Sequence, residues 1–193
     1  MSAKCQGVLY FIGLSKQERS KITELDFSNK EFSVERMNQL CEVFKTTPNT
    51  IKELSFAASR LNPELMKIIA TGIVHLQDLE ILTVSNNNQI QDEGMFQLIF
   101  VLGQLKNLRH LSVSHTGLTD KSGIPLAKAL ASHPSLKSVS FDANDFGTPT
   151  FSALSESLTN SKNTTLTEIF YLYDCKDENI KKKLSAILNI NKK

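Results

Sequence analysis

Tryptophan is absent from this 193-residue chain, and cysteine, proline and glycine are sparse, with three, five and eight copies. Three cysteines are an odd number, and their spacing is typical of neither a metal site nor a disulfide framework. Cys41 falls on the apolar face of an expected helix, which favours a buried thiol. Nothing in this usage calls for an oxidising compartment, so we expect a cytoplasmic protein.

Motifs that carry catalytic or cofactor chemistry are also missing. The four histidines are His75, His110, His115 and His133, and they form no HxxxH or HExxH pair. The sequence contains no glycine-rich phosphate loop and no carboxylate pair set in an expected pocket. We therefore expect no metal, no cofactor and no enzyme activity.

Neither charge nor hydrophobicity is extreme. The formal net charge is +2, which gives no strong field and does not favour a nucleic acid partner. The longest apolar run, Val8 to Leu14, is far shorter than the roughly 20 residues of a membrane span, and no small-x-small cleavage site follows it. An apolar fraction of 40% and a charged fraction of 22% are typical of a soluble folded domain.

A short apolar pattern does return six times along the chain. Its copies start at Ile22, Ile51, Leu79, Leu108, Leu136 and Leu166, and the spacing is 28 to 30 residues. Each copy has apolar residues at its first, fourth and sixth positions. Self-similarity at such a period predicts a solenoid, in which every unit buries its apolar face against its neighbours.

The fourth copy shows what one unit contains. Leu111 and Val113 alternate with polar residues, as in a half-buried strand. Thr119 and Asp120 are good helix caps and precede apolar residues at helical spacing, and Pro134 ends that helix. The corresponding helix starts elsewhere are Ser33, Asn62–Pro63, Asp92 and Thr148–Pro149. The sequence thus predicts strand, turn and helix in each unit.

The form Leu-x-x-Leu-x-Leu-x-x-Asn-x-Leu resembles the leucine-rich repeats of the ribonuclease-inhibitor subclass. The resemblance implies an α/β fold: a leucine-rich-repeat solenoid, curved as a segment of a right-handed horseshoe. Its parallel β-sheet would line the concave face and its helices the convex face. Residues 1–21 would form an N-terminal cap, residues 22–176 the six repeats, and residues 177–193 a C-terminal capping helix with a basic tail.

Departures from the repeat make local predictions. Asn87 and Asn144 match the consensus asparagine, so we expect ordered turns there, whereas Lys30 marks an imperfect first repeat. One extra residue precedes Ile90 and predicts a small bulge. Lys176 stands at a core position, so the solenoid should stop there, with a helix over Asp177 to Asn189 as its polar cap.

The first 21 residues lie outside the repeat phase. Val8 to Ile12 is rich in β-formers and is bracketed by Gly7 and Gly13, which favours a strand over a helix. Such a strand would cover the open edge of the sheet, which would otherwise invite aggregation. Ser15 to Lys21 is polar and is expected to be a turn or a short helix.

Outward strand positions would form the concave surface, and they are where we expect a partner to bind. The candidate partner-binding residues are Glu24, Asp26, Glu53, Ile81, His110, His115, Asp142, Phe170, Leu172 and Tyr173. The surface is acidic at its N-terminal end, hydroxylated in the middle and aromatic at the last strand. Exposed aromatic residues often anchor interfaces, but the last three candidates could instead lie beneath the C-terminal cap.

His110 lies near Ser112 and Ser114 and requires a test for nucleophilic catalysis. A nucleophile needs an adjacent base, and that base needs an orienting acid. On a flat strand the serine is neither strained nor exposed by a loop, and no oxyanion hole accompanies it. We therefore expect no catalysis at this position.

The resemblance implies a non-catalytic module that binds a partner protein on its concave face, and we expect a monomer. One alternative is an effector that a bacterium secretes into the cytoplasm of a host cell, since 14 asparagines and many lysines are typical of an AT-rich genome. Another is a regulator of a small GTPase resembling the Ran GTPase-activating proteins, which would use an exposed arginine. Arg60 and Arg109 are the only arginines in the strand and turn segments.

Overall fold

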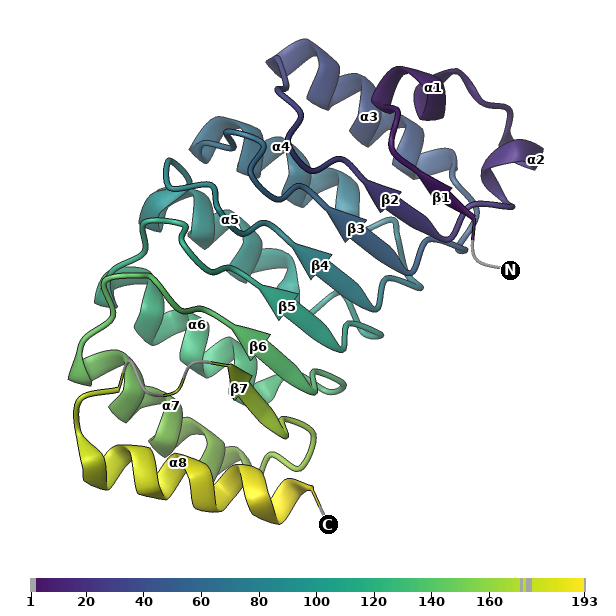
Figure 1. The fold of residues 1–193 in the computed structure, drawn as a ribbon. Coiled ribbons are helices and arrows are strands. Elements are labelled where there is room, and N and C mark those ends of the chain that lie inside the picture. The colour runs from purple at the N-terminus through teal and green to yellow at the C-terminus, as the bar shows by residue number, and fades with distance from the viewer. Residues whose placement is uncertain (1–2, 171, 173–174, 193) are drawn as a thin grey trace.

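Seven short parallel strands follow one another in chain order across one open sheet, and the helices lie along the other side (Figure 1). This computed structural model describes residues 3–170, 172 and 175–192. The elements are β1 (Lys4–Cys5), α1 (Val8–Gly13), α2 (Lys16–Arg19), β2 (Glu24–Asp26), α3 (Val34–Thr46), β3 (Glu53–Ser55), α4 (Pro63–Ile73), β4 (Ile81–Thr83), α5 (Gln91–Leu102), β5 (His110–Ser112), α6 (Asp120–Ser132), β6 (Ser138–Ser140), α7 (Thr148–Ser161), β7 (Glu168–Phe170) and α8 (Glu178–Asn191). The stack is curved, with the sheet on its concave side, as the expected leucine-rich-repeat solenoid requires.

The strands from β2 to β7 are in register at identical repeat positions. Glu24 pairs with Glu53, which pairs with Ile81, and the fourth positions Leu25, Leu54 and Leu82 pair in the same way. The same register continues up to β7, without a shift between any two strands. Because a slip of one residue would turn every core side chain to the opposite face, this register follows directly from the repeated pattern.

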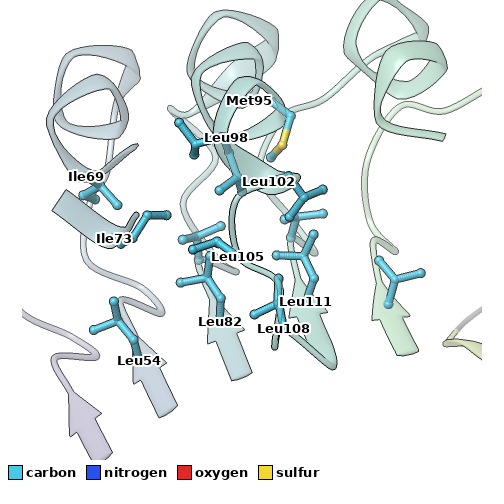
Figure 2. Packing of buried hydrophobic residues seen from close by; sticks show 14 of the residues in the cluster. Leu54, Ile69, Ile73, Leu82, Met95, Leu98, Leu102, Leu105, Leu108 and Leu111 are labelled. Carbon is cyan, nitrogen blue, oxygen red and sulfur yellow. The ribbon is translucent and has the colours of Figure 1, made fainter. Parts of the chain in front are cut away.

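The core lies between the sheet and the helices. Figure 2 shows Leu82 and Leu111 of the strands facing Leu98 and Leu102 of α5, with Ile69 of α4 beside them. All five side chains are essentially inaccessible to solvent. Burying each side chain contributes roughly 2 kcal/mol, and much of each buried surface is covered by the neighbouring repeat.

Side-chain caps begin several helices where the sequence predicts them. Ser33 accepts a hydrogen bond from the Arg36 N–H, and Asn62 accepts one from the Leu65 N–H, with Pro63 in the first turn. These caps satisfy amide donors that have no partner inside the helix. The predicted helix starts at Ser33 and Asn62 are therefore confirmed.

Two aspartates cap the helix of the following repeat rather than their own. Asp92 lies in the first turn of α5, and its carboxylate accepts bonds from the Thr119 N–H (2.9 Å) and the Ser122 hydroxyl (2.6 Å). Asp120 accepts a bond from the Thr150 N–H (3.2 Å) at the start of α7, which has no side-chain cap of its own. Burial opposes ionisation of Asp92, but these hydrogen bonds outweigh it and lower the pKa of its carboxyl. The caps thus join consecutive helices.

The consensus asparagine of the third repeat, Asn87, joins two turns. Its Oδ1 accepts bonds from the N–H groups of Ser59 (2.8 Å) and Leu61 (3.0 Å) in the preceding repeat. Its Nδ2 donates to the carbonyls of Phe56 (2.9 Å) and Val84 (2.8 Å). The side chain therefore satisfies buried backbone groups that the turn leaves without partners.

Asn144, two repeats further along the chain, makes the same set of bonds. Its Oδ1 accepts from the N–H groups of Thr116 (3.0 Å) and Leu118 (3.1 Å), and its Nδ2 donates to the carbonyls of Val113 (2.9 Å) and Phe141 (2.8 Å). The ordered turns predicted at both asparagines are confirmed. At the first repeat Lys30 is exposed and provides no equivalent side chain.

The eighth position of five repeats has a left-handed backbone. Asn29, Ala58, Asn86, His115 and Ala143 have φ between 52° and 60°. Each turn needs this conformation to redirect the chain from the strand into the helix, whatever residue is present. Asparagine tolerates it readily, whereas alanine adopts it at a cost of about 1 to 2 kcal/mol.

The prediction of a strand over Val8 to Ile12 is wrong. The edge strand is instead β1, whose Cys5 pairs with Leu25, and residues 8–13 form α1. Helical spacing turns Phe11 into the core, where its ring lies 6.3 Å from those of Phe27 and Phe44. For Ser15 to Lys21 a turn or a short helix was expected, and the structure has the short helix, α2.

The extra residue of the third repeat, for which a small bulge before Ile90 was expected, lies in the turn that follows β4. The Ile90 N–H donates to the Asn87 carbonyl (3.0 Å), and Gln91 has a φ of 51°. Ile90 is fully buried, as predicted. Because the insertion falls after the strand, the sheet register is undisturbed.

At the C-terminal end Cys175 is buried and Lys176 is exposed. Asp177 caps α8 by accepting bonds from the N–H groups of Asn179 (2.9 Å) and Ile180 (3.1 Å). Leu184 and Leu188 of α8 are buried, and the lysines at positions 182 and 183 are exposed. The last helix therefore covers the end of the core with a polar outer surface. None of the described helices is long and apolar enough to cross a membrane.

We expect replacement of Asn87 by alanine to lower the free energy of unfolding by about 2 to 4 kcal/mol, because buried backbone groups lose their partners. Urea denaturation measures this loss. Gln89→Ala changes an exposed side chain two residues away and is the matched control. Equal stability of the two variants would contradict the role assigned to Asn87.

We expect Ala58→Gly to stabilise the protein by about 0.5 to 1 kcal/mol, since glycine adopts the left-handed backbone without steric cost. Ala57 lies outside the left-handed region, so Ala57→Gly should destabilise the protein by about the same amount. Melting temperatures of the pair provide the measurement. A loss of stability in both variants would show that the φ of Ala58 is not strained.

Candidate functional site

The concave surface is built from the third and fifth residues of each repeat, which flank a buried fourth residue. Glu53 on β3 is exposed, whereas Glu24, Asp26 and Ile81 are half-buried by their neighbours. These four candidates lie on adjacent strands β2, β3 and β4 and share one shallow depression of about 240 Å³. Repeat stacking therefore brings together residues that are up to two repeats apart in the sequence.

A cation from the N-terminal segment partly neutralises the acidic end. Lys4 on β1 places its Nζ 2.7 Å from Glu24 Oε1 and 3.0 Å from Asp26 Oδ2, and Gln6 Nε2 donates to the same Asp26 oxygen (3.1 Å). The Ser28 hydroxyl and the Lys4 ammonium hold the pKa of Asp26 well below its usual range. Sequence reasoning missed Lys4 because it precedes the repeats.

Glu53 has no ion-pair partner within the part of the chain that the structure describes. It is therefore the carboxylate of the acidic end that is most available to a basic group of a partner. Its neighbour Ile81 adds apolar surface to the same depression. The arrangement can accommodate a lysine or arginine side chain, with the stem on Ile81 and the charged group at Glu53.

Hydroxyl groups pair with one another across strands, both at the N-terminal end of the concave surface and in its middle. Ser28 and Ser55 lie 2.8 Å apart through their Oγ atoms, and Ser85 and Ser112 lie 2.6 Å apart. The Ser114 N–H also donates to Ser85 Oγ (3.0 Å). These contacts hold the side chains in place and give the middle of the surface a uniform, polar character.

His110 and Asp142 belong to two separate pairs. His110 Nδ1 is hydrogen-bonded to the Ser138 hydroxyl of the next strand, and the Ser114 hydroxyl donates to the Asp142 carboxylate. A nucleophilic relay would need the carboxylate on the histidine. The described contacts do not connect Asp142 to His110. His115 is exposed at its left-handed turn position.

The last strand bears an exposed aromatic side chain. Phe170 on β7 is 40% exposed, and its strand partner is Ser140. Leu172 is half-buried and packs against the core, so it contributes less to the surface than Phe170. Tyr173, the third aromatic-end candidate, lies outside the described residues. Of the two described residues, Phe170 is the more exposed and is the one that contributes to the open surface.

Two other groups of exposed apolar residues were not found from the sequence. Phe96 and Phe100 lie on the outer side of α5, and Phe100 is 84% exposed. Their spacing of four residues, outside the core stripe of that helix, was an available signal. Leu9 and Tyr10 of α1 are 64% and 66% exposed. Their exposure was missed because a strand was expected at that segment.

The two arginines in the strand and turn segments both contact carboxylates. Arg60 Nη1 lies 2.6 Å from Glu31 Oε1, and Arg109 Nε lies 3.4 Å from Glu80 Oε2. The Arg60–Glu31 pair is exposed and Glu80 is only half-buried, and ion pairs at the surface contribute little to stability. Neither arginine extends freely from the surface as an arginine that reaches into a nucleotide site would.

No group of three metal-ligating side chains occurs among residues 3–170, 172 and 175–192. The three cysteines are buried free thiols. Burial raises the pKa of the Cys41 thiol to about 12, so this residue is unreactive near neutral pH and serves as an apolar core residue.

The parallel strands, stacked in chain order with the helices on the other side (Figure 1), give the chain the fold of a leucine-rich-repeat solenoid. A family model described as Leucine Rich repeat matches residues 75–98 and 104–127, two segments that begin four residues before the third and fourth repeats and end inside them. No curated protein sequence matches the chain significantly.

Solved structures confirm the fold. A structure titled "Leiomodin-1 Actin-Binding Site 2 (ABS2)" is 16% identical, with a TM-score of 0.59, over 96% of this chain and 87% of that one. A second, titled "Crystal structure of TLR13-ssRNA13 complex", is 17% identical, with a TM-score of 0.50, over 82% of this chain. The chain spans only 20% of that longer protein. At these identities the likeness concerns the fold.

His133 is the buried histidine, and it predicts a pH dependence of stability. Its Nε2 lies 3.2 Å from the Leu102 carbonyl, and the Leu136 N–H donates to its Nδ1 (3.2 Å), so the folded protein holds the neutral ring. Burial lowers the pKa of His133 below the ordinary value of 6.5. Stability should therefore fall as the pH drops below about 6.5, where the unfolded chain takes up the proton.

Urea denaturation at about pH 7.5 and about pH 5.5 measures this loss, and the dependence should be shallower in His133→Gln. The remaining histidines are common to both proteins, so the difference isolates His133. An identical slope in the variant would show that His133 does not contribute to the pH dependence.

Proposed function

We propose that this protein is a non-catalytic interaction module that binds a partner protein on its concave surface. The observation that supports the proposal most directly is the unlike chemistry of neighbouring concave positions on an otherwise regular sheet. The third positions of adjacent strands carry Glu53, Ile81 and His110, while the fourth positions are uniformly apolar. Because stacking constrains the core positions, the side chains outside the core are those that can vary and determine which partner is bound.

The surface favours a partner segment with a basic residue at one end and an apolar residue at the other. Glu53 and Ile81 would receive the basic side chain, and Phe170 would contact the apolar one. Asp142 and His115 lie between the two ends, at the fourth and fifth repeats. Actin is a reasonable first candidate, since the similar leiomodin-1 structure is titled as an actin-binding site.

A protein partner is a better fit than nucleic acid, although the similar TLR13 structure is a complex with single-stranded RNA. The net charge is only +2, and the N-terminal end of the concave surface is acidic. Phosphate groups would be repelled by Glu53 and its neighbours. We also propose that the chain acts as a monomer.

The repeats fit the ribonuclease-inhibitor-like subclass best, because their period is 28 to 30 residues and each contains a helix of 11 to 14 residues. Three buried free thiols support an intracellular location, whether in the producing cell or in a host cell that receives the protein as an effector. Small-GTPase regulation is less well supported, because Arg60 and Arg109 are both paired with carboxylates.

The test combines affinity capture with two concave variants, Glu53→Lys and Phe170→Ala. Purified actin is the first candidate, and partners captured from a lysate follow. Each variant should weaken binding about tenfold or more, because each removes one end of the recognition surface. Glu64→Lys reverses the charge of an exposed residue on α4 and is the matched control, which should bind like wild type.

Melting temperatures must accompany the binding data. If Phe170→Ala lowers the melting temperature by several degrees, Phe170 belongs to the cap and is not a binding residue. If partners bind both concave variants as tightly as the wild type, the concave-surface proposal is wrong.

A further inference from the structure

An apolar patch is exposed at the N-terminal end of the molecule, away from the strand residues of the concave surface. Leu9 and Tyr10 of α1 are 64% and 66% exposed and line the same groove. Large apolar side chains exposed together, rather than singly, are typical of interaction sites.

A groove of about 660 Å³ lies between α1 and the first turn of α3. Leu9 and Tyr10 line one side, and Lys30, Glu31 and Arg36 line the other. The groove is large enough to take one or two side chains of a docked segment. Its lining combines an apolar wall with a charged wall, so that it can contact both apolar and charged side chains of one segment.

The apolar wall is held in place from within. The Phe11 ring packs edge-on against Phe27, with 6.3 Å between ring centroids, and is fully buried. The Phe11 N–H donates to the Gly7 carbonyl (2.8 Å) and closes the first turn of α1. Because Phe11 fixes the inner side of this short helix, Leu9 and Tyr10 on its outer side have nowhere to pack within the described chain.

The uncompensated charge of the groove is positive. Glu31 is paired with Arg60 at 2.6 Å, whereas Lys30 and Arg36 form no ion pair with the described residues. Glu35, the next carboxylate on α3, accepts a hydrogen bond from Gln39 (3.4 Å) and does not line the groove. An occupant that brings carboxylates would therefore meet two free cations beside an apolar wall.

We propose that this groove is a second docking site, which binds a short acidic peptide segment with apolar side chains. The apolar side chains would pack on Leu9 and Tyr10, and the carboxylates would pair with Lys30 and Arg36. Gln6 lines the groove and also donates to Asp26, so the groove borders the acidic end of the concave surface. The two sites have opposite charge, so a segment suited to one is repelled by the other.

The test uses the full chain labelled with ¹⁵N and a fluorescein-labelled peptide of alternating glutamate and leucine. The peptide should shift amide signals of residues 6–10 and 30–36, with little change at the strands. The double variant Leu9→Ser, Tyr10→Ser should weaken binding about tenfold, and Lys30→Gln with Arg36→Gln should weaken it several-fold, increasingly so at low salt.

Phe100→Ser removes an exposed aromatic side chain on α5 and is the matched control, which should bind the peptide like wild type. All replaced residues are on the surface, and unchanged melting temperatures would confirm that the variants fold. A peptide of alternating lysine and leucine should bind at least about tenfold more weakly.

Three outcomes of the peptide experiments would overturn the proposal. The lysine peptide could bind as well as the glutamate peptide, the shifts could map to the concave strands, or no binding could occur at millimolar peptide. A dimer seen by sedimentation and abolished by the Leu9→Ser, Tyr10→Ser variant would also overturn it, because the occupant would then be a second copy. None of these results depends on Glu53 or Phe170, so failure here is distinguishable from failure of the concave-surface proposal.

Discussion

Stacking of each repeat on the next is the interaction on which the rest of this structure depends. One strand–turn–helix unit has too little interior to bury its own leucines, and Leu54, Leu82 and Leu111 become inaccessible only because their neighbours cover them. The polar contacts follow the same logic, since Asn87 and Asp92 both satisfy backbone groups in an adjacent repeat. Stability is therefore shared along the chain, and it should be lowest at the ends, where one neighbour is missing.

This dependence also explains where function can reside. Stacking fixes the first, fourth and sixth positions of each repeat and leaves the third and fifth strand positions open. Those positions form the acidic depression near Glu53 and the aromatic end at Phe170. The ends of the stack are the other variable region, because they need caps that do not follow the repeat. The groove beside Tyr10 arises from such a cap.

Much of the repeat region could be predicted because its signals are local. Ser33 and Asn62 cap the expected helices, Asn87 orders its turn, and Ile90 fills the core despite the insertion before it. The cap was harder to predict, because β-forming residues at 8–12 favour a strand when read alone. In the folded chain that segment is a helix, and Phe11 packs from it against the rings of Phe27 and Phe44, contacts that the local sequence does not reveal.

By itself, the sequence determined the architecture, since a pattern repeated at a constant period has few ways to bury its apolar face. It also determined which residues point outward from the sheet. Tertiary structure decided how those residues are paired: Lys4 neutralises part of the acidic end, and Ser114 rather than His110 contacts Asp142. These pairings join residues that are 20 to 28 positions apart. Periodicity fixes the face on which a side chain lies, but its partner depends on the atoms that the neighbouring repeat brings within reach.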